Sequence, residues 1–144
     1  MSNYAGSVVS RILAIDYGDV RIGLALTDPL KIISSGYKTI KNEGDEKIID
    51  ALKAIILSEE VEKIILGHPV GLDGNKTKKT VQVEQFGEKL KLLGKEIILF
   101  DESFSSKRAH QIIHEMGKKT GNNKEMIDML AAQVILEDYL RSVQ

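Results

Sequence analysis

The sequence contains no cysteine, so neither a disulfide nor a thiolate-bound metal site can form in this chain. It also has no tryptophan, and its three phenylalanines and four tyrosines leave little aromatic surface for stacking on unpaired bases. Positive charge is not in excess, because the formal net charge is −1. This balance argues against a protein that coats nucleic acid through bulk charge, although it allows a local basic surface. No apolar run approaches the ~20 residues that a membrane-spanning helix needs.

Length and composition fit one globular domain. The chain has 144 residues, of which 42% are hydrophobic and 28% charged, close to the average soluble domain and enough to bury a core. No internal repeat or linker rich in Pro, Gly or Ser divides the sequence. We expect a short flexible tail at residues 1–10, which lack the pattern of a secretion signal, and a single domain over residues 11–144.

Apolar patterning along the chain predicts alternating strands and helices. The expected strands cover residues 11–16, 21–27, 37–40, 63–67 and 96–101. Four helices are expected. The first starts at Asp45 as its N-cap, and the second runs from Thr77 to Leu93. The third includes Ala109 to Met116, and the fourth runs from Lys124 to Arg141. The order β-β-β-α-β-α-β-α-α predicts an α/β fold, a mixed sheet of five strands with helices on both faces.

Two of the expected strands place acidic side chains at one edge of this sheet. Asp16 ends the first strand, and the pair Asp101-Glu102 follows the last one. Because the first, fourth and fifth strands should be parallel, their carboxyl ends meet at the edge where open α/β sheets bind ligands. Taken singly, each acid also fits a solvated strand end or a helix cap.

Asp128 is an acid within an apolar row of the last expected helix. The row that it shares contains Ala131, Ala132, Ile135 and Tyr139. A carboxylate buried on such a face must be paired, protonated or bound to a metal ion. The structural alternative is a salt bridge, for which Lys124 lies one turn earlier.

Asp16, Glu102 and Asp128 together predict a catalytic metal site. At ~5 Å and an effective dielectric constant of ~20, each carboxylate pair would repel by roughly 3 kcal/mol, so a cluster needs protonation or a counter-charge. A divalent cation supplies that charge, and ligands that offer only oxygen suit Mg²⁺ or Mn²⁺. Such ions activate water and stabilise the charge that develops in phosphodiester cleavage. That the three acids meet in space is an expectation from the topology.

Basic residues flank these acids along the chain and are candidates for contact with nucleic-acid phosphates. The start of the second expected helix adds backbone amides that favour anions. A solvated surface is the alternative for each basic residue, and packing beside the sheet edge is the alternative for Tyr17. The predicted nucleic-acid contacts are Tyr17, Arg21, Lys76, Lys78, Lys79, Lys107, Arg108, Lys118, Lys119 and Lys124.

Several motifs in a fixed order resemble those of the YqgF/RuvX family. The match extends roughly from Arg11 to Leu140, so that it does not depend on any one motif. The motifs are Asp16-Tyr17-Gly18, residues 21–29 (RIGLALTDP), Gly67-His68-Pro69 with Asp73-Gly74 downstream, Asp101-Glu102, and residues 128–140, which begin DMLAAQ.

The resemblance implies a ribonuclease H-like fold in a cytoplasmic bacterial protein. The family is described both as Holliday junction resolvases and as nucleases that process the 5′ end of pre-16S ribosomal RNA. By motif, Asp16, Glu102 and Asp128 would be the catalytic acids that bind Mg²⁺ or Mn²⁺. The implied partner is pre-ribosomal RNA or branched DNA, with no membrane, and the chain would act as a monomer or a homodimer.

Two positions depart from the family pattern. Ser103 stands where the family commonly has an arginine, which removes a phosphate-contacting or acid-orienting charge. His68 replaces a leucine, either as a general base or phosphate donor or as a tolerated loop substitution. His110 and His114 have the spacing of a zinc pair, but no third ligand stands out, and we expect a solvated face.

Two other functions remain open at this point. An Asp-x-Gly motif before a hairpin of small residues also opens actin-like and sugar-kinase ATPases, although those enzymes need two such domains and this chain is too short for both. The chain would otherwise be a non-catalytic RNA-binding ribosome-assembly factor that keeps its acids for structural reasons.

Overall fold

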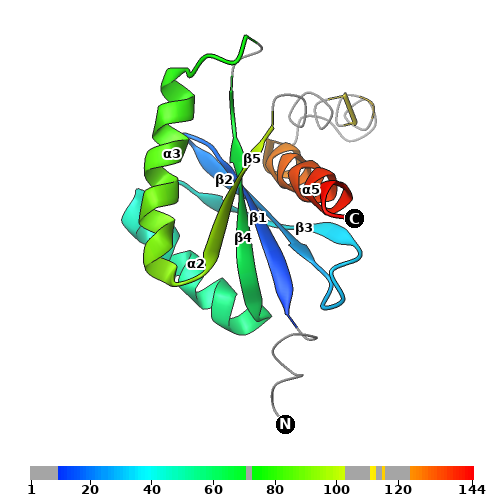
Figure 1. Ribbon diagram of the computed structural model, residues 1–144. Helices are drawn as coiled ribbons and strands as arrows, with labels where there is room; N and C mark the ends of the chain where they lie inside the picture. The colour runs from blue at the N-terminus through cyan, green and yellow to red at the C-terminus, as the bar shows by residue number, and fades with distance from the viewer. Residues whose placement is uncertain (1–9, 71–72, 103–110, 113–114, 116–123) are drawn as a thin grey trace.

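The computed structural model describes residues 10–70, 73–102, 111–112, 115 and 124–144. Within them, one five-stranded sheet has the strand order β3-β2-β1-β4-β5 (Figure 1). The elements are β1 (Arg11–Tyr17), β2 (Arg21–Thr27), β3 (Ser34–Lys41), α2 (Asp45–Glu59), β4 (Val61–His68), α3 (Lys78–Leu90), the 3₁₀ turn η1 (Lys91–Leu93), β5 (Glu96–Asp101) and α5 (Lys124–Ser142).

The sheet is mixed, as the sequence predicts. β2 pairs antiparallel with both β1 and β3, whereas β1, β4 and β5 are parallel. The carboxyl ends of β1, β4 and β5 therefore lie at one edge. β2 and β5 have the predicted bounds. β1, β3 and β4 are longer than predicted, by up to four residues.

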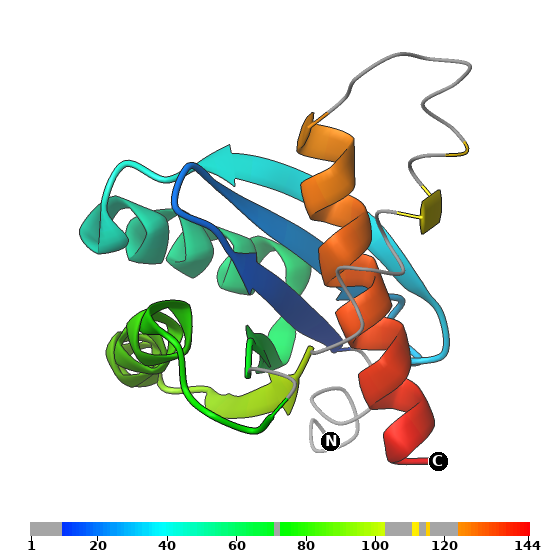
Figure 2. The same cartoon turned by 90° about the horizontal axis from the view of Figure 1, so that it is seen from above.

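Helices cover both faces of the sheet. α2 and α3 lie on one face and α5 on the other (Figures 1 and 2). Successive residues of β1 alternate between the two cores: Leu13 and Ile15 belong to the core under α2 and α3, and Ile12 and Ala14 to the core under α5. Because both faces are buried, β1 is apolar without a polar alternation.

The starts of two helices follow from capping chemistry, with one correction. The N-cap of α2 is Gly44, at φ 106°, and not Asp45. Asp45 is the first helical residue, and its carboxylate instead accepts hydrogen bonds from Lys89 and Tyr17. The cap of α3 is Thr77, whose side chain and that of Thr80 each accept from the other's backbone N–H.

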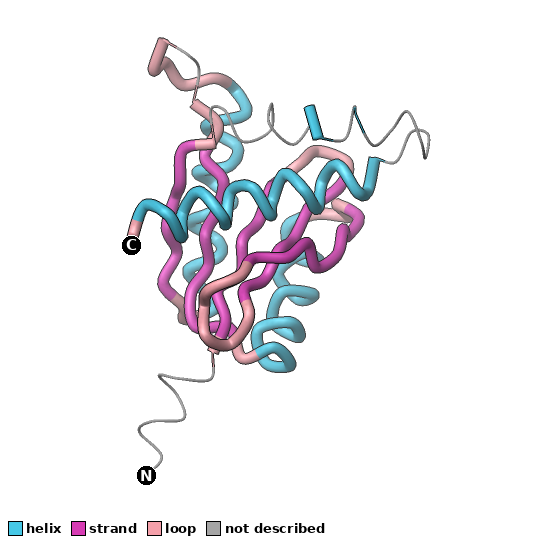
Figure 3. The backbone as a smooth tube through the Cα atoms, turned by 90° about the vertical axis from the view of Figure 1, so that its right-hand side faces the viewer, coloured by secondary structure: helices cyan, strands magenta, loops and turns pink. Residues whose placement is uncertain are grey.

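Helix α5 runs across the strands on its face of the sheet (Figure 3). The other predicted helix, from Ala109 to Met116, falls largely outside the described residues. Ser10, which the sequence placed in a flexible tail, is buried and donates a hydrogen bond to Glu62. None of the described helices is long and apolar enough to cross a membrane.

Candidate active site

The three predicted acids come from three elements that meet at the carboxyl edge of the parallel strands. Asp16 is the sixth residue of β1, and Glu102 directly follows β5. The backbone N–H of Glu102 donates to the carbonyl of His68 at 3.2 Å, which fixes the chain as it leaves β5. Asp128 lies near the start of α5. The topology thus brings the three acids to one end of the sheet, as predicted.

Gly23 allows Asp128 to approach Asp16. It lies opposite Asp16 in the β1–β2 pairing. A Cβ at Gly23 would lie 2.0 Å from the backbone oxygen of Asp128, a distance at which no side chain fits. Gly23 is not among the site residues predicted from the sequence, although a glycine inside a buried strand signals a close backbone approach.

Gly67 plays the corresponding part for Glu102. A Cβ at Gly67, in β4, would lie 1.9 Å from Oε2 of Glu102. This carboxylate oxygen is buried, and it has no hydrogen-bond partner in the part of the chain that the structure describes. A buried polar oxygen without a partner is costly and is rare in native proteins unless a ligand or ion completes it.

The electrostatics of Asp16 and Glu102 follow from their burial and proximity. Burial is the main cause that raises the pKa of Glu102 to about 8, and the charge of Asp16 is the second. Burial is also the main cause that raises the pKa of Asp16 to about 6, and the charge of Asp128 is the second. The ammonium group of Lys79 opposes both shifts. A hydrogen bond between the two carboxyls also raises the pKa of Glu102 and lowers that of Asp16, so Glu102 is the one that keeps its proton.

These acids fit a hard divalent cation. They offer only oxygen, one of these oxygens is orphaned, and their mutual repulsion needs a positive charge. However, no three His, Asp or Glu side chains within the described ranges are already arranged to hold an ion. One oxygen of Asp128 is already engaged, because its Oδ2 accepts a hydrogen bond from Nε of Arg21 at 2.6 Å. Asp128 thus forms the salt bridge of the structural alternative, but its partner is Arg21 rather than Lys124.

A family model described as "RuvX: Holliday junction resolvase" matches residues 10–142. The chain belongs to the RuvX family. A relative in Flavobacterium psychrophilum named "Putative pre-16S rRNA nuclease" is 39% identical over 134 residues, which cover 90% of this chain and 96% of the relative. A relative of the same name in Ruminiclostridium cellulolyticum is 37% identical over 132 residues, which cover 90% and 93%.

Solved structures support the fold of this RuvX-family chain. RuvC of T. thermophilus, in complex with a Holliday junction substrate, matches with a TM-score of 0.59 at 12% identity. The match covers 94% of this chain and 97% of the RuvC chain. The resolvase of Fowlpox virus with Holliday junction DNA has a TM-score of 0.54 at 12% identity, with coverage of 92% and 98%. The fold is ribonuclease H-like, as the sequence resemblance implied.

Of the predicted basic contacts that the structure describes, Lys79 acts directly on Asp16 and Glu102. Lys79, in the first turn of α3, forms an ion pair with Asp19 at 3.3 Å, and its charge acts on Asp16 and Glu102. Lys76 and Lys78 are exposed beside it. Four further predicted contacts fall outside the described residues: Lys107, Arg108, Lys118 and Lys119. Ser103, His110 and His114 also fall outside them. Lys124 is exposed at the start of α5.

Tyr17 is not placed to stack on a base. The residue is 6% exposed, and its ring packs against Phe86 with ring centroids 4.3 Å apart. Nζ of Lys79 lies 5.3 Å from its ring centroid, and its hydroxyl donates to Asp45 at 2.7 Å. The structure therefore favours packing, the alternative reading of this residue, because α3 covers the ring.

His68 is held by a charged neighbour on α3. Its Nε2 lies 2.8 Å from Oε2 of Glu84, which also pairs with Lys76 at 3.1 Å. Through its backbone carbonyl, His68 anchors the N–H of Glu102. The side chain of His68 is thus engaged with α3, and its contact with the acid cluster runs through the backbone.

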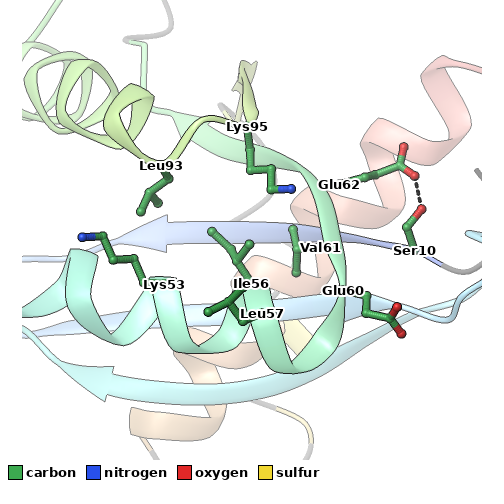
Figure 4. Close-up of a pocket in the computed structure, with 9 residues that line it drawn as sticks. All are labelled: Ser10, Lys53, Ile56, Leu57, Glu60, Val61, Glu62, Leu93 and Lys95. Atoms are coloured by element: carbon green, nitrogen blue, oxygen red, sulfur yellow. Dashed lines mark hydrogen bonds between the residues drawn. The ribbon is translucent and has the colours of Figure 1, made fainter. Parts of the chain in front are cut away.

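A separate cavity lies at the opposite edge of the sheet. It measures about 500 Å³ and is lined by α2 and by residues at the amino ends of β1, β4 and β5, among them Ser10, Val61 and Lys95 (Figure 4). None of the predicted site residues that the structure describes lines it. Ligands of open α/β sheets bind at the carboxyl edge of the strands, so this cavity is not the candidate active site.

Proposed function

We propose that this chain is a divalent-metal-dependent endonuclease that hydrolyses phosphodiester bonds, with Asp16, Glu102 and Asp128 as the acids that hold the metal ion. The observation that carries the proposal is the buried Oε2 of Glu102, unpartnered among the described residues, beside the carboxyl of Asp16. A domain that needed only stability would gain nothing from burying two acids together. The proposed nuclease domain spans residues 11–144.

The residues of the chain would divide the work as follows. Mg²⁺ or Mn²⁺, when bound, would supply an activated water and neutralise charge at the scissile phosphate. Asp16 and Glu102 are positioned by β1 and β5, the parallel strands on either side of β4, and Asp128 by a helix that Gly23 lets approach. Lys79 lowers the pKa of Asp16 and Glu102, which favours the ionised forms that bind a cation.

The substrate that we propose is the 5′ end of pre-16S ribosomal RNA, in the cytoplasm. The relatives at 39% and 37% identity carry the name of a pre-16S rRNA nuclease, and they match this chain over nearly their whole length. The description of the family as a Holliday junction resolvase makes branched DNA the second candidate substrate. Either nucleic acid offers phosphates to the exposed Lys76 and Lys78, which lie close to Lys79 in the sequence.

The decisive experiment is cleavage-site mapping on a matched panel of pre-ribosomal RNA fragments and four-way DNA junctions. We expect metal-dependent cleavage that Asp16→Asn and Glu102→Gln abolish. The control is Asp50→Asn, which also removes one carboxylate but lies exposed on α2. An Asp16→Asn protein that cuts as fast as the wild type, after a second purification step excludes contaminating nuclease, would disprove the proposal.

A non-catalytic RNA-binding assembly factor is the second candidate function. The Arg21–Asp128 ion pair favours it, because a paired Asp128 can serve stability alone. Complementation separates the two functions: an Asp128→Asn protein that folds normally and still supports 16S rRNA maturation in cells would favour the assembly factor. Loss of maturation with unchanged folding would favour the nuclease.

A further inference from the structure

Arg21 links the start of β2 to the start of α5. Its Nε donates to Oδ2 of Asp128 at 2.6 Å, and the two side chains are 29% and 21% exposed. The residues are 107 positions apart in the sequence, so only the fold brings them together. A charge-assisted hydrogen bond that is mostly shielded from water is stronger than an exposed one.

This ion pair occupies an oxygen that the candidate site would offer to an ion. The charge of Asp128 lies close enough to Asp16 to raise the pKa of that carboxyl. Even so, the described His, Asp and Glu residues do not include three that are arranged to hold an ion. One carboxylate oxygen of Asp128 is engaged by Arg21. This oxygen is available to an ion only after Arg21 has released it.

We propose that Arg21 is a counter-charge which a divalent ion displaces from Asp128, and that the released guanidinium then binds a phosphate of the nucleic acid. The inference rests on the proposed function, because it takes Asp128 as a metal ligand. A cation with two charges, placed among three carboxylates, outcompetes one guanidinium for the same oxygen. A guanidinium fits a phosphate through two parallel hydrogen bonds as well as it fits a carboxylate.

The exchange couples the two ligands of the enzyme. Ion binding frees Arg21 for the phosphate, and a phosphate that holds Arg21 leaves Asp128 free for the ion. Because such coupling is reciprocal, each ligand raises the affinity for the other by the same factor. Without the ion, Asp128 stays neutralised and the acid cluster carries less net repulsion.

The direct test follows the Nε–H proton of Arg21 by NMR in the ¹⁵N-labelled full chain. Without metal, the hydrogen bond to Asp128 protects this proton from exchange with water. At saturating Mg²⁺ we expect its exchange to accelerate by roughly tenfold, towards the rate in an Asp128→Ala protein. Calorimetry on the same sample shows whether Mg²⁺ is bound.

The outcomes separate the inference from the proposed function. If Mg²⁺ binds and the Arg21 proton stays protected, the ion pair is permanent and the inference is wrong, whereas the nuclease proposal stands. If Mg²⁺ does not bind at all, both are wrong.

A variant gives an independent readout. Arg21→Gln should tighten the apparent affinity for Mg²⁺ by about fivefold, because the competing cation is gone. The control is Lys53→Gln, the same charge change on α2 beside the distant cavity, which should leave that affinity unchanged. Weaker Mg²⁺ binding in Arg21→Gln would instead make Arg21 a clamp that holds Asp128 ready, and would overturn the inference.

Discussion

Oε2 of Glu102 lies in the space that a side chain at Gly67 would occupy, since a Cβ there would be 1.9 Å from this oxygen. The residues come from neighbouring parallel strands, one within β4 and the other just after β5. The geometry of the acid cluster therefore depends on the absence of a side chain as much as on the acids themselves.

We expect Gly67→Ala to displace the carboxyl of Glu102. Because a misplacement of about 1 Å at a catalytic group can cost on the order of 100-fold, cleavage should fall by that order. Overpacking should also lower the free energy of unfolding by ~1–3 kcal/mol. The control is Gly87→Ala in α3. A Cβ there would lie 3.3 Å from the end of the Leu66 side chain, a much less crowded contact than the one at Gly67. Equal activity of both variants would contradict the described packing.

The raised pKa values of Glu102 and Asp16 predict how stability depends on pH without metal. Burial holds these pKa values at about 8 and about 6, above the ordinary 4.5 and 3.8 of the unfolded chain. Between those limits the folded state binds more protons than the unfolded state, so stability falls as pH rises from about 4 to about 8. Urea unfolding in EDTA at pH 5 and pH 8 measures the difference.

Glu102→Gln provides the control for this pH dependence. It removes the group with the larger shift, and it should be more stable than the wild type at pH 8 in EDTA. Mg²⁺ should reverse the trend in the wild type only, because the ion binds the ionised acids. A wild-type stability that is flat over this range would show that the two acids are not buried together.

The buried position of Tyr17 predicts a structural role. Tyr17→Phe removes the hydroxyl that donates to Asp45 at 2.7 Å, which should lower the free energy of unfolding by about 1 kcal/mol. Nucleic-acid affinity should not change, because α3 covers the ring. Tyr37→Phe, which loses a longer 3.2 Å bond to Glu59, is the matched variant. A clear loss of affinity in Tyr17→Phe alone would restore Tyr17 as a contact residue.

Much of the fold follows from local sequence patterns. Short apolar runs predict strands directly, and the one that ends at Asp16 is buried on both faces of the sheet. The parallel order of β1, β4 and β5 then places Asp16 and Glu102 at one edge. This step needs only the rule for connections between parallel strands and no side-chain detail.

The details of the site depend on contacts that span most of the chain. The pairing of Asp128 with Arg21 cannot be read from helical spacing, which points to Lys124 instead. The burial of Tyr17 depends on Phe86, which belongs to a helix on the face that Tyr17 happens to meet. A shift of one residue in the start of a helix also matters. The N-cap of α2 is Gly44 rather than Asp45, and the carboxylate of Asp45 pairs with Lys89 instead.

Lys79 should tune the acids rather than only attract the substrate. Its charge lowers the pKa of Asp16 and of Glu102, so Lys79→Gln should raise both pKa values. Since the acids bind a cation in their ionised form, the rising limb of the activity–pH profile should move to higher pH. At pH 7 the cleavage rate should fall by roughly tenfold. The control is Lys78→Gln, an exposed neighbour that should weaken nucleic-acid binding without moving the profile. If both variants leave the limb in place, the charge of Lys79 does not act on the acids.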